Sequence, residues 1–406
     1  MSLADLFAES LAAIRAHALR SFLTLLGIII GVATIVGVVS VIAGLEGYVQ
    51  EKILVLSPDV YVVTKFGIIR SREEFLEALK RRDITLDEYR RLQTLLREAS
   101  EMAAQVEATN VVKRADRRLT GVETIGTTAN YPRLIDVDLA GGRFFLEGEE
   151  RSGAAVTVIG WDLKEELFPQ MDPVGREILI GGVPFHVIGV VTKKGSTLGQ
   201  NQDNRLYLPI TSFRQNFGSR QSVDMLIRAA GGVPGVERSV DEVRAALRAL
   251  RHTPYRAADP FGVVTAEALQ QLWRQISTAA FVLLFLISAV SLGVGGVVIM
   301  NIMLVSVLER TAEIGVRKAV GAHETDVRRQ FVLEATLLSL GGGLVGAALG
   351  AGAAYGVRAG LDFPARVGPG ILALGLGLSV VVGLVSGWWP AWRASKLNAI
   401  EALRVE

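Results

Sequence analysis

Residues that could perform catalysis or bind a metal are few and scattered in this 406-residue chain. Cysteine is absent, which excludes thiolate catalysis, thiolate metal sites and disulfides. The four histidines lack metal-ligand spacing: His323-Glu324 begins like the zinc motif HExxH, but the fifth position is Val327. Neither a GxxxxGK[ST] phosphate loop nor a GxSxG nucleophile turn occurs. We therefore expect a non-enzymatic chain with no catalytic residue, no metal site and no cofactor of its own.

Glycine spacing is the second pattern. The stretch Gly341–Gly346 formally matches GxGxxG, but it lies in an apolar segment without a preceding strand, so helix packing explains it better than nucleotide binding. Glycines four residues apart let helix backbones approach closely in lipid. The pair Gly352 and Gly356 has this spacing too. We expect packing between helices, or between the two copies of a dimer, at Gly27, Gly31, Gly342, Gly346, Gly350, Gly383 and Gly387.

A charged segment forms the third pattern. Glu309, Glu313 and Arg317 follow one another at intervals of four, which predicts a helix continuing beyond an apolar stretch, with Glu313 and Arg317 able to pair. Several apolar residues of this segment have no obvious core of their own: Ile314, Val316, Ala319 and Val320. From spacing alone two interpretations stay open, a docking surface or a solvated loop whose charges only set topology.

The elements that carry these residues follow from hydropathy. Half of the residues are hydrophobic and the mean hydropathy is +0.38, high for a soluble globule. Four windows contain no charged residue, and each exceeds the about 20 residues that a helix needs to cross lipid. These windows lack the polar face of a soluble core helix, and the first is too long for a cleaved signal peptide. They predict four transmembrane helices, over 21–45, 275–308, 335–357 and 367–392.

Orientation follows from lysine and arginine. The segments 1–20, expected to be helical, 309–334 and 393–406 together carry ten of these residues, whereas the short loop 358–366 carries two. Positive residues favour the cytoplasmic side. We therefore expect a multi-pass protein of the cell inner (cytoplasmic) membrane with both termini in the cytoplasm and residues 46–274 outside it.

The outer segment 46–274 is long enough to bury its own core. Helical spacing over Ser71–Glu101, with Thr85 and Asp87 as possible N-caps, gives way to a strand-rich insertion over about 102–227, in which Gly181-Gly182 predicts a hairpin. A helix is expected over Ser239–Leu250. The expected fold is an α-helical membrane protein with four transmembrane helices and a large α+β extracytoplasmic domain inserted between the first and second. A net charge of +2 gives no reason to expect nucleic-acid binding.

Several segments resemble MacB-type ABC transporter permeases, within the FtsX-like permease superfamily. Asn301–Ala322, NIMLVSVLERTAEIGVRKAVGA, is the most specific match, and Asp172–Val191 is typical of the MacB-type periplasmic core. In the tail, Asn398-Ala399 stands where Asp-Pro is more usual. Further similar segments are Arg20–Leu45, Gln330–Ala335 and Pro390–Arg404.

The resemblance implies a permease that forms a homodimer and works with a cytoplasmic ABC ATPase, which binds the ATP and Mg²⁺. MacB carries this ATPase at its own N-terminus, so here a separate polypeptide is expected. It also implies that helix movement drives the outer domain (mechanotransmission), with a periplasmic adaptor of the membrane fusion type and an outer-membrane duct as further partners beside membrane lipid. ATPase coupling then falls on Glu309, Arg310, Glu313, Ile314, Arg317, Lys318, Ala319, Gly321 and Ala322.

Two alternatives share this topology. One is an FtsX-like transmembrane regulator that activates an extracytoplasmic cell-wall hydrolase. The other is a lipoprotein-releasing permease of the LolC/LolE type, which the first span resembles less. Neighbouring genes separate the three: an adaptor favours export, a hydrolase favours regulation, and a paired non-identical permease favours lipoprotein release.

The predicted topology can be tested by cysteine labelling, because the native chain has no cysteine. An impermeant thiol reagent should label a cysteine at Gly199 in spheroplasts, since residues 46–274 are expected outside. A cysteine at Ala322 should react only after the membrane is permeabilised. Labelling of Ala322 in intact spheroplasts, with protection of Gly199, would invert the assignment.

Overall fold

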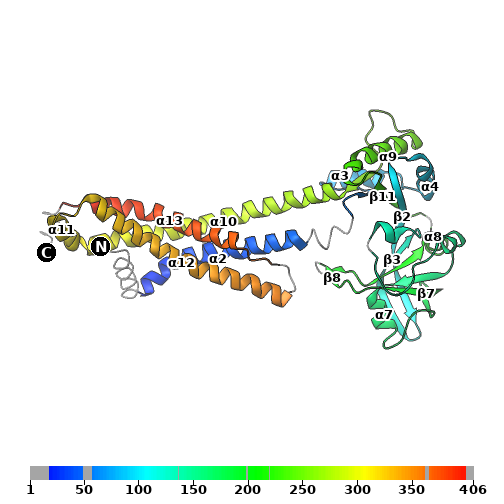
Figure 1. The fold of residues 1–406 in the computed structure, drawn as a ribbon, viewed down its shortest axis with the longest axis horizontal. Coiled ribbons are helices and arrows are strands. Elements are labelled where there is room, and N and C mark those ends of the chain that lie inside the picture. The colour runs from blue at the N-terminus through cyan, green and yellow to red at the C-terminus, as the bar shows by residue number, and fades with distance from the viewer. Residues whose placement is uncertain are drawn as a thin grey trace. The chain divides into compact units, whose positions relative to one another are not determined.

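A computed structural model describes residues 18–48, 57–135, 137–197, 200–218, 220–361 and 365–398. The chain divides into a helical unit, Met1–Val49 with Trp273–Glu406, and an α/β unit, Gln50–Leu272 (Figure 1). The boundary falls inside one helix, α10 (Ala266–Glu309). The predicted N-terminal helix before residue 18, the end of the tail beyond 398, and Gly199 lie outside the described residues.

The helical unit contains four helices long and apolar enough to cross a membrane, and each carries one of the charge-free windows. The fold class predicted from the sequence, four such helices with an α+β domain between the first two, is confirmed. They run alongside one another in Figure 1, and Val32, Leu292 and Phe331 belong to one buried cluster between them. The helices of this unit are α2 (Ala18–Tyr48), α10, α11 (Thr311–Ala319), α12 (Glu324–Leu361) and α13 (Pro369–Ser395).

The helix predicted to continue past Glu309 is interrupted instead. At Arg310 the backbone leaves the helical region, with φ −102° and ψ 14°, and α11 begins one residue later. The Thr311 hydroxyl donates to the carbonyls of Val307 (3.1 Å) and Leu308 (2.8 Å), so a side chain takes over acceptors at the end of α10. Gly321, with φ +106°, follows the end of α11 in the conformation that glycine adopts most readily. Because the interruption depends on these local bonds, charge spacing alone did not predict it.

The α/β unit is built on one ten-stranded sheet with the path β12-β1-β11-β2-β3-β10-β5-β7-β4. The remaining strand, β6, pairs with both β2 and β7, so β2, β3, β10, β5, β7 and β6 form a closed ring of paired strands. The strands are β1 (Val60–Thr64), β2 (Ala99–Arg114), β3 (Arg117–Thr127), β4 (Leu139–Gly142), β5 (Val156–Ile159), β6 (Glu177–Ile180), β7 (Val183–Val191), β10 (Arg205–Pro209), β11 (Asp224–Ala229) and β12 (Gly262–Thr265), with a separate hairpin of β8 (Ser196–Thr197) and β9 (Gln200–Asn201).

Both faces of this sheet are covered. Successive side chains of a strand point to opposite faces, and the buried residues divide accordingly: Leu206 and Leu208 of β10 join one apolar cluster, while Tyr207 between them joins another. The helices of this unit are α3 (Arg72–Lys80), α4 (Leu86–Leu95), α5 (Tyr131–Leu134), α6 (Glu147–Ser152), α7 (Trp161–Leu167), α8 (Ile210–Phe217), the 3-10 helix η2 (Val233–Gly235) and α9 (Val236–Leu250).

Local predictions in this unit are confirmed where a few neighbouring residues decide the structure. The Thr85 hydroxyl accepts from the Glu88 backbone N–H (3.2 Å), and the Glu88 carboxylate accepts from the Thr85 N–H (2.8 Å), a capping box at the start of α4. Asp87 lies in the first turn instead of at the cap. Gly181 and Gly182 join β6 to β7 with positive φ angles of 58° and 91°.

A buried ion pair ties α9 to the start of α4. Arg251 reaches both carboxylate oxygens of Glu88, each at 2.9 Å, and the side chains are 4% and 10% exposed. Arg251 also donates to the carbonyls of Asp83 and Pro260. Burial opposes ionisation of Glu88, but the hydrogen bonds from Arg251 and from the backbone of Thr85 outweigh it, so the pKa of Glu88 is lowered.

Replacing Arg251 with Met should lower the free energy of unfolding by about 3 kcal/mol at pH 7.5, because Glu88 would remain buried without its partner. A lowered carboxylate pKa stabilises the fold above the unfolded pKa, and this contribution is lost as the pH falls through the folded pKa. The deficit of the variant should therefore shrink at pH 4.5, where Glu88 can protonate. Urea unfolding at both pH values measures it, and an equal deficit at both would contradict this role.

Candidate functional site

The segment predicted to couple to an ATPase forms α11, and four of its side chains hold it against neighbouring helices. Ile314 is 3% exposed and belongs to the same buried cluster as residues of α12. Arg317 donates to Gln330 of α12 (2.7 Å) and to Glu313 (2.6 Å), so the predicted pairing of Glu313 with Arg317 is confirmed. Lys318 donates to two backbone carbonyls at the end of α13, those of Ser395 (2.5 Å) and Leu397 (2.8 Å).

The residue just before α11 is held in the same way. Arg310 pairs with Glu334 of α12 at 3.4 Å, and Glu334 is 9% exposed. Arg310, Ile314, Arg317 and Lys318 therefore fix the segment in place. Arg317 and Lys318, both predicted for ATPase coupling, already donate hydrogen bonds to Gln330 of α12 and to the carbonyls of Ser395 and Leu397.

The other side of α11 faces outward and is apolar. Val316 is 51% exposed and Val320, directly after the helix, is 85% exposed, an unusual fraction for side chains of this type. Together with the exposed Ala312 and Ala319 they lie at helical spacing, and we call these four residues the α11 patch. Glu309, Glu313 and Gly321 are exposed around it, while Ala322 is half-buried. One side of the segment is thus held by α12 and α13, and the other side is apolar and is not covered by any of the described residues.

The seven glycines predicted for packing lie in contacts between helices of the same chain. A Cβ added to Gly27 would lie 2.8 Å from the Cα of Gly295 in α10, and one on Gly31 would lie 2.8 Å from Leu292. Gly342, Gly346 and Gly350 of α12 face α2, while Gly383 and Gly387 of α13 face α12. These faces are occupied within the chain, so the structure gives no support to a dimer contact through Gly27 and Gly31.

Gly352 and Gly356 have the same spacing but do not pack closely against another helix. An added Cβ at either position would meet no atom within 4 Å. Gly346 and Gly350, in contrast, would place a Cβ 2.7 Å from the Ile29 carbonyl oxygen and 2.6 Å from that of Ala33. The interval of four residues alone does not separate the two pairs, since the difference depends on which face of α12 meets another helix.

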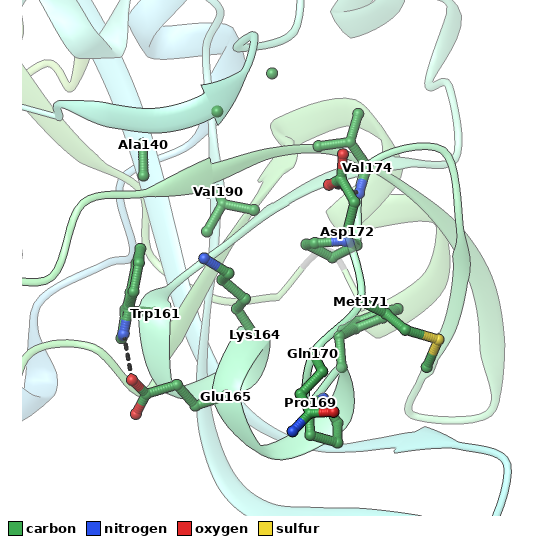
Figure 2. Close-up of a pocket in the computed structure, with 14 residues that line it drawn as sticks. Ala140, Trp161, Lys164, Glu165, Pro169, Gln170, Met171, Asp172, Val174 and Val190 are labelled. Atoms are coloured by element: carbon green, nitrogen blue, oxygen red, sulfur yellow. Dashed lines mark hydrogen bonds between the residues drawn. The ribbon is translucent and has the colours of Figure 1, made fainter.

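A cleft of about 810 Å³ in the α/β unit was not predicted from the sequence (Figure 2). The Trp161 indole donates to Glu165 (2.6 Å), and the Lys164 ammonium lies 3.8 Å from the centre of the Trp161 ring. The hydrogen bond from Trp161 lowers the pKa of Glu165. Met171 and Val174 add apolar side chains to a lining that also includes the carboxylates of Glu165 and Asp172, so the cleft presents apolar surface with charged groups of both signs. The only sequence signal was the family-like segment that begins at Asp172.

Comparison with known families decides the identity of both regions. Residues 21–250 match the MacB-like periplasmic core domain, and residues 285–399 match the FtsX-like permease C-terminal domain. The chain belongs to the MacB-like permease family. The first match spans α2 and most of the α/β unit, including the cleft, and the second contains α11, α12 and α13.

Relatives of this MacB-like permease cover nearly all of it. It is 35% identical over 395 residues to the macrolide export ATP-binding/permease protein MacB of Bdellovibrio bacteriovorus, covering 96% of this chain and 60% of that protein. It is 34% identical over 397 residues to the pyoverdine export ATP-binding/permease protein PvdT of Pseudomonas syringae pv. syringae, covering 95% and 57%. The periplasmic region of MacB from Actinobacillus actinomycetemcomitans is a further match, with a TM-score of 0.46 and 16% identity over 55% of this chain and 96% of that one. The chain thus spans about 60% of the length of the two relatives.

The packing glycines generate a prediction with a control on the same helix. Gly350→Leu should lower the free energy of unfolding by about 2 kcal/mol or more, because the new side chain meets the backbone of α2. Gly352→Leu should cause no loss, since its position is open and leucine favours helix over glycine. Thermal unfolding of the purified protein in detergent gives both values, and an equal loss in the two variants would contradict the assigned packing.

Proposed function

We propose that this chain is the permease of an ABC-type export system in the cell inner membrane. An ABC ATPase domain outside these 406 residues binds ATP and Mg²⁺ and supplies the energy. Membership of the MacB-like family supports this, since the names of both relatives combine ATP binding, permease and export. The two names state different cargoes, macrolide and pyoverdine, so the proposal stops at export.

The observation that carries the proposal is the two-sided character of α11. A docking element must be held by its own protein, so that force applied to it is transmitted, and it must present a surface that a partner covers. Arg317 and Lys318 supply the first property through their bonds to α12 and α13. Val316 and Val320 supply the second, because exposed apolar side chains are stabilised when a partner removes them from water. With both chain ends cytoplasmic, the α11 patch faces the ATPase.

Transmission runs through α10. This single helix of 44 residues begins at Ala266, directly after β12, and ends at Glu309, next to α11. At a rise of about 1.5 Å per residue it is about 66 Å long. Movement of α11 therefore reaches the outer domain through a continuous hydrogen-bonded element. The charge-free windows of these helices suit a mechanism in which cargo is handled outside the cytoplasm and needs no polar path through lipid.

The remaining partners follow from the same proposal. The permease works as two copies. Each of the two ATPase domains of an ABC dimer then docks on the α11 of one permease copy. The outer domain hands cargo to a periplasmic adaptor and an outer-membrane duct. The cleft beside Trp161 and Lys164 is the part of the described outer domain best suited to contact a cargo or adaptor, because it combines a ring, charged groups of both signs and apolar walls.

Docking through the α11 patch predicts that Val316→Glu with Val320→Glu weakens ATPase binding by about tenfold or more, since charge would enter an apolar contact. The two side chains are exposed, so folding should be unaffected. Co-purification of the permease with its ATPase, and the ATPase rate of the complex, measure the effect. Charge reversal of Arg317 and Lys318 is a poorer test, because it would also detach α11 from α12 and α13.

Thr325→Glu is the matched control, because Thr325 is exposed and lies outside α11. It should leave ATPase binding at the wild-type level. If the double variant at Val316 and Val320 also binds normally while its melting temperature is unchanged, the α11 patch is not the docking surface.

A further inference from the structure

Three tryptophans gather on the exposed surface of one end of α13. Trp388, Trp389 and Trp392 are 57%, 53% and 43% exposed, and the rings of Trp389 and Trp392 lie 5.6 Å apart. They account for three of the five tryptophans of the chain. No packing within the helical unit explains their exposure, because the buried side of this end of α13 consists of small residues such as Ala391 and Ala394.

Arginines lie at the same level. The Arg328 guanidinium of α12 lies 5.6 Å from the centre of the Trp388 ring, and Arg393 follows Trp392 directly on α13. Among the described residues neither arginine has a carboxylate within ion-pair distance, since Glu324 at the start of α12 pairs with Lys396 at 2.8 Å. A guanidinium held over a ring keeps N–H donors free for an anion.

The position of this cluster is that of a membrane interface. Trp388, Trp389 and Trp392 end the last charge-free window, and Arg393 is the first charge after it. Tryptophan is enriched where hydrocarbon meets headgroups, and arginine side chains extend from there toward the polar layer. The group that meets an arginine at this depth is the phosphate of a lipid, and a headgroup without a cation of its own strengthens the attraction.

We propose that Arg328, seated on Trp388, binds the headgroup of an anionic phospholipid, with Arg393 as a second donor and Trp389 and Trp392 against the glycerol and upper acyl region. The occupant is a lipid and not a protein, because the tryptophans belong to a membrane-spanning helix. This site is separate from the α11 patch and does not depend on the proposed export function.

The test uses the full chain in nanodiscs of phosphatidylcholine, doped with brominated phosphatidylglycerol or brominated phosphatidylcholine, which quench nearby tryptophans. Wild type should favour phosphatidylglycerol by about fivefold in association constant, the usual effect of one interfacial cation. Arg328→Gln and Trp388→Leu should reduce the preference to about one.

Arg329→Gln is the matched control, because Arg329 is the neighbouring residue, loses the same charge, and points about 100° away on the helix. It should keep the preference of the wild type. Equal losses in Arg328→Gln and Arg329→Gln would mean unspecific surface attraction and would overturn the proposal, as would a wild type without preference. The melting temperature of each variant in phosphatidylcholine alone should match wild type, and Trp388→Leu provides a second route if Arg328→Gln fails this control.

Discussion

The approach of α12 to the backbone of α2 is the contact on which the helical unit depends. Lipid offers helices no hydrophobic reason to associate, so van der Waals contact between them has to supply the stabilisation. Gly346 and Gly350 permit it, since a Cβ at either position would lie within 2.7 Å of a carbonyl oxygen of α2. This contact sets where α12 lies. The start of the same helix carries Gln330 and Glu334, so the closeness of two backbones in the membrane also decides where α11 can be held.

Hydrogen bonds to backbone carbonyls hold α11 in place as much as interactions between side chains do. The last carbonyls of a helix lack partners within it and carry partial negative charge. Lys318 donates to the carbonyl of Ser395, the last residue of α13, and to that of Leu397 just beyond it, while Arg317 and Arg310 reach polar groups of α12. The lysine and arginine side chains whose number predicts a cytoplasmic segment therefore bond to other groups of the same chain. The surface left exposed includes the apolar side chains of Val316 and Val320, which the sequence already indicated as lacking a core.

Sequence predicted those features that a few neighbouring residues determine. Charge-free windows indicated the four long helices, Thr85 the cap of α4, and Gly181-Gly182 the hairpin, because hydropathy, capping and turn geometry are local. It could not distinguish Gly350 from Gly352, since the partner of each face comes from a distant segment. It also could not reveal that β6 pairs with both β2 and β7, or that Trp161 and Lys164 border a cleft. For α11 it indicated the Glu313–Arg317 pair and the lack of a core around Val316 and Val320, but not that Ile314 is buried.

Under the proposed docking function, this division constrains how the sequence of α11 can change. Side chains that hold α11, such as Ile314 and Lys318, are tied to α12 and α13, so a substitution there alters the mounting whatever partner binds. Val316 and Val320 contact little within the chain and can be replaced without disturbing the fold. Under the proposed docking function, partner recognition would therefore vary through these few exposed residues while force transmission stays constant. Because the patch is small and apolar, the proposal implies that discrimination between partners comes from its shape and from the exposed carboxylates at its edge, Glu309 and Glu313, more than from the positive charges that already bond to α12 and α13.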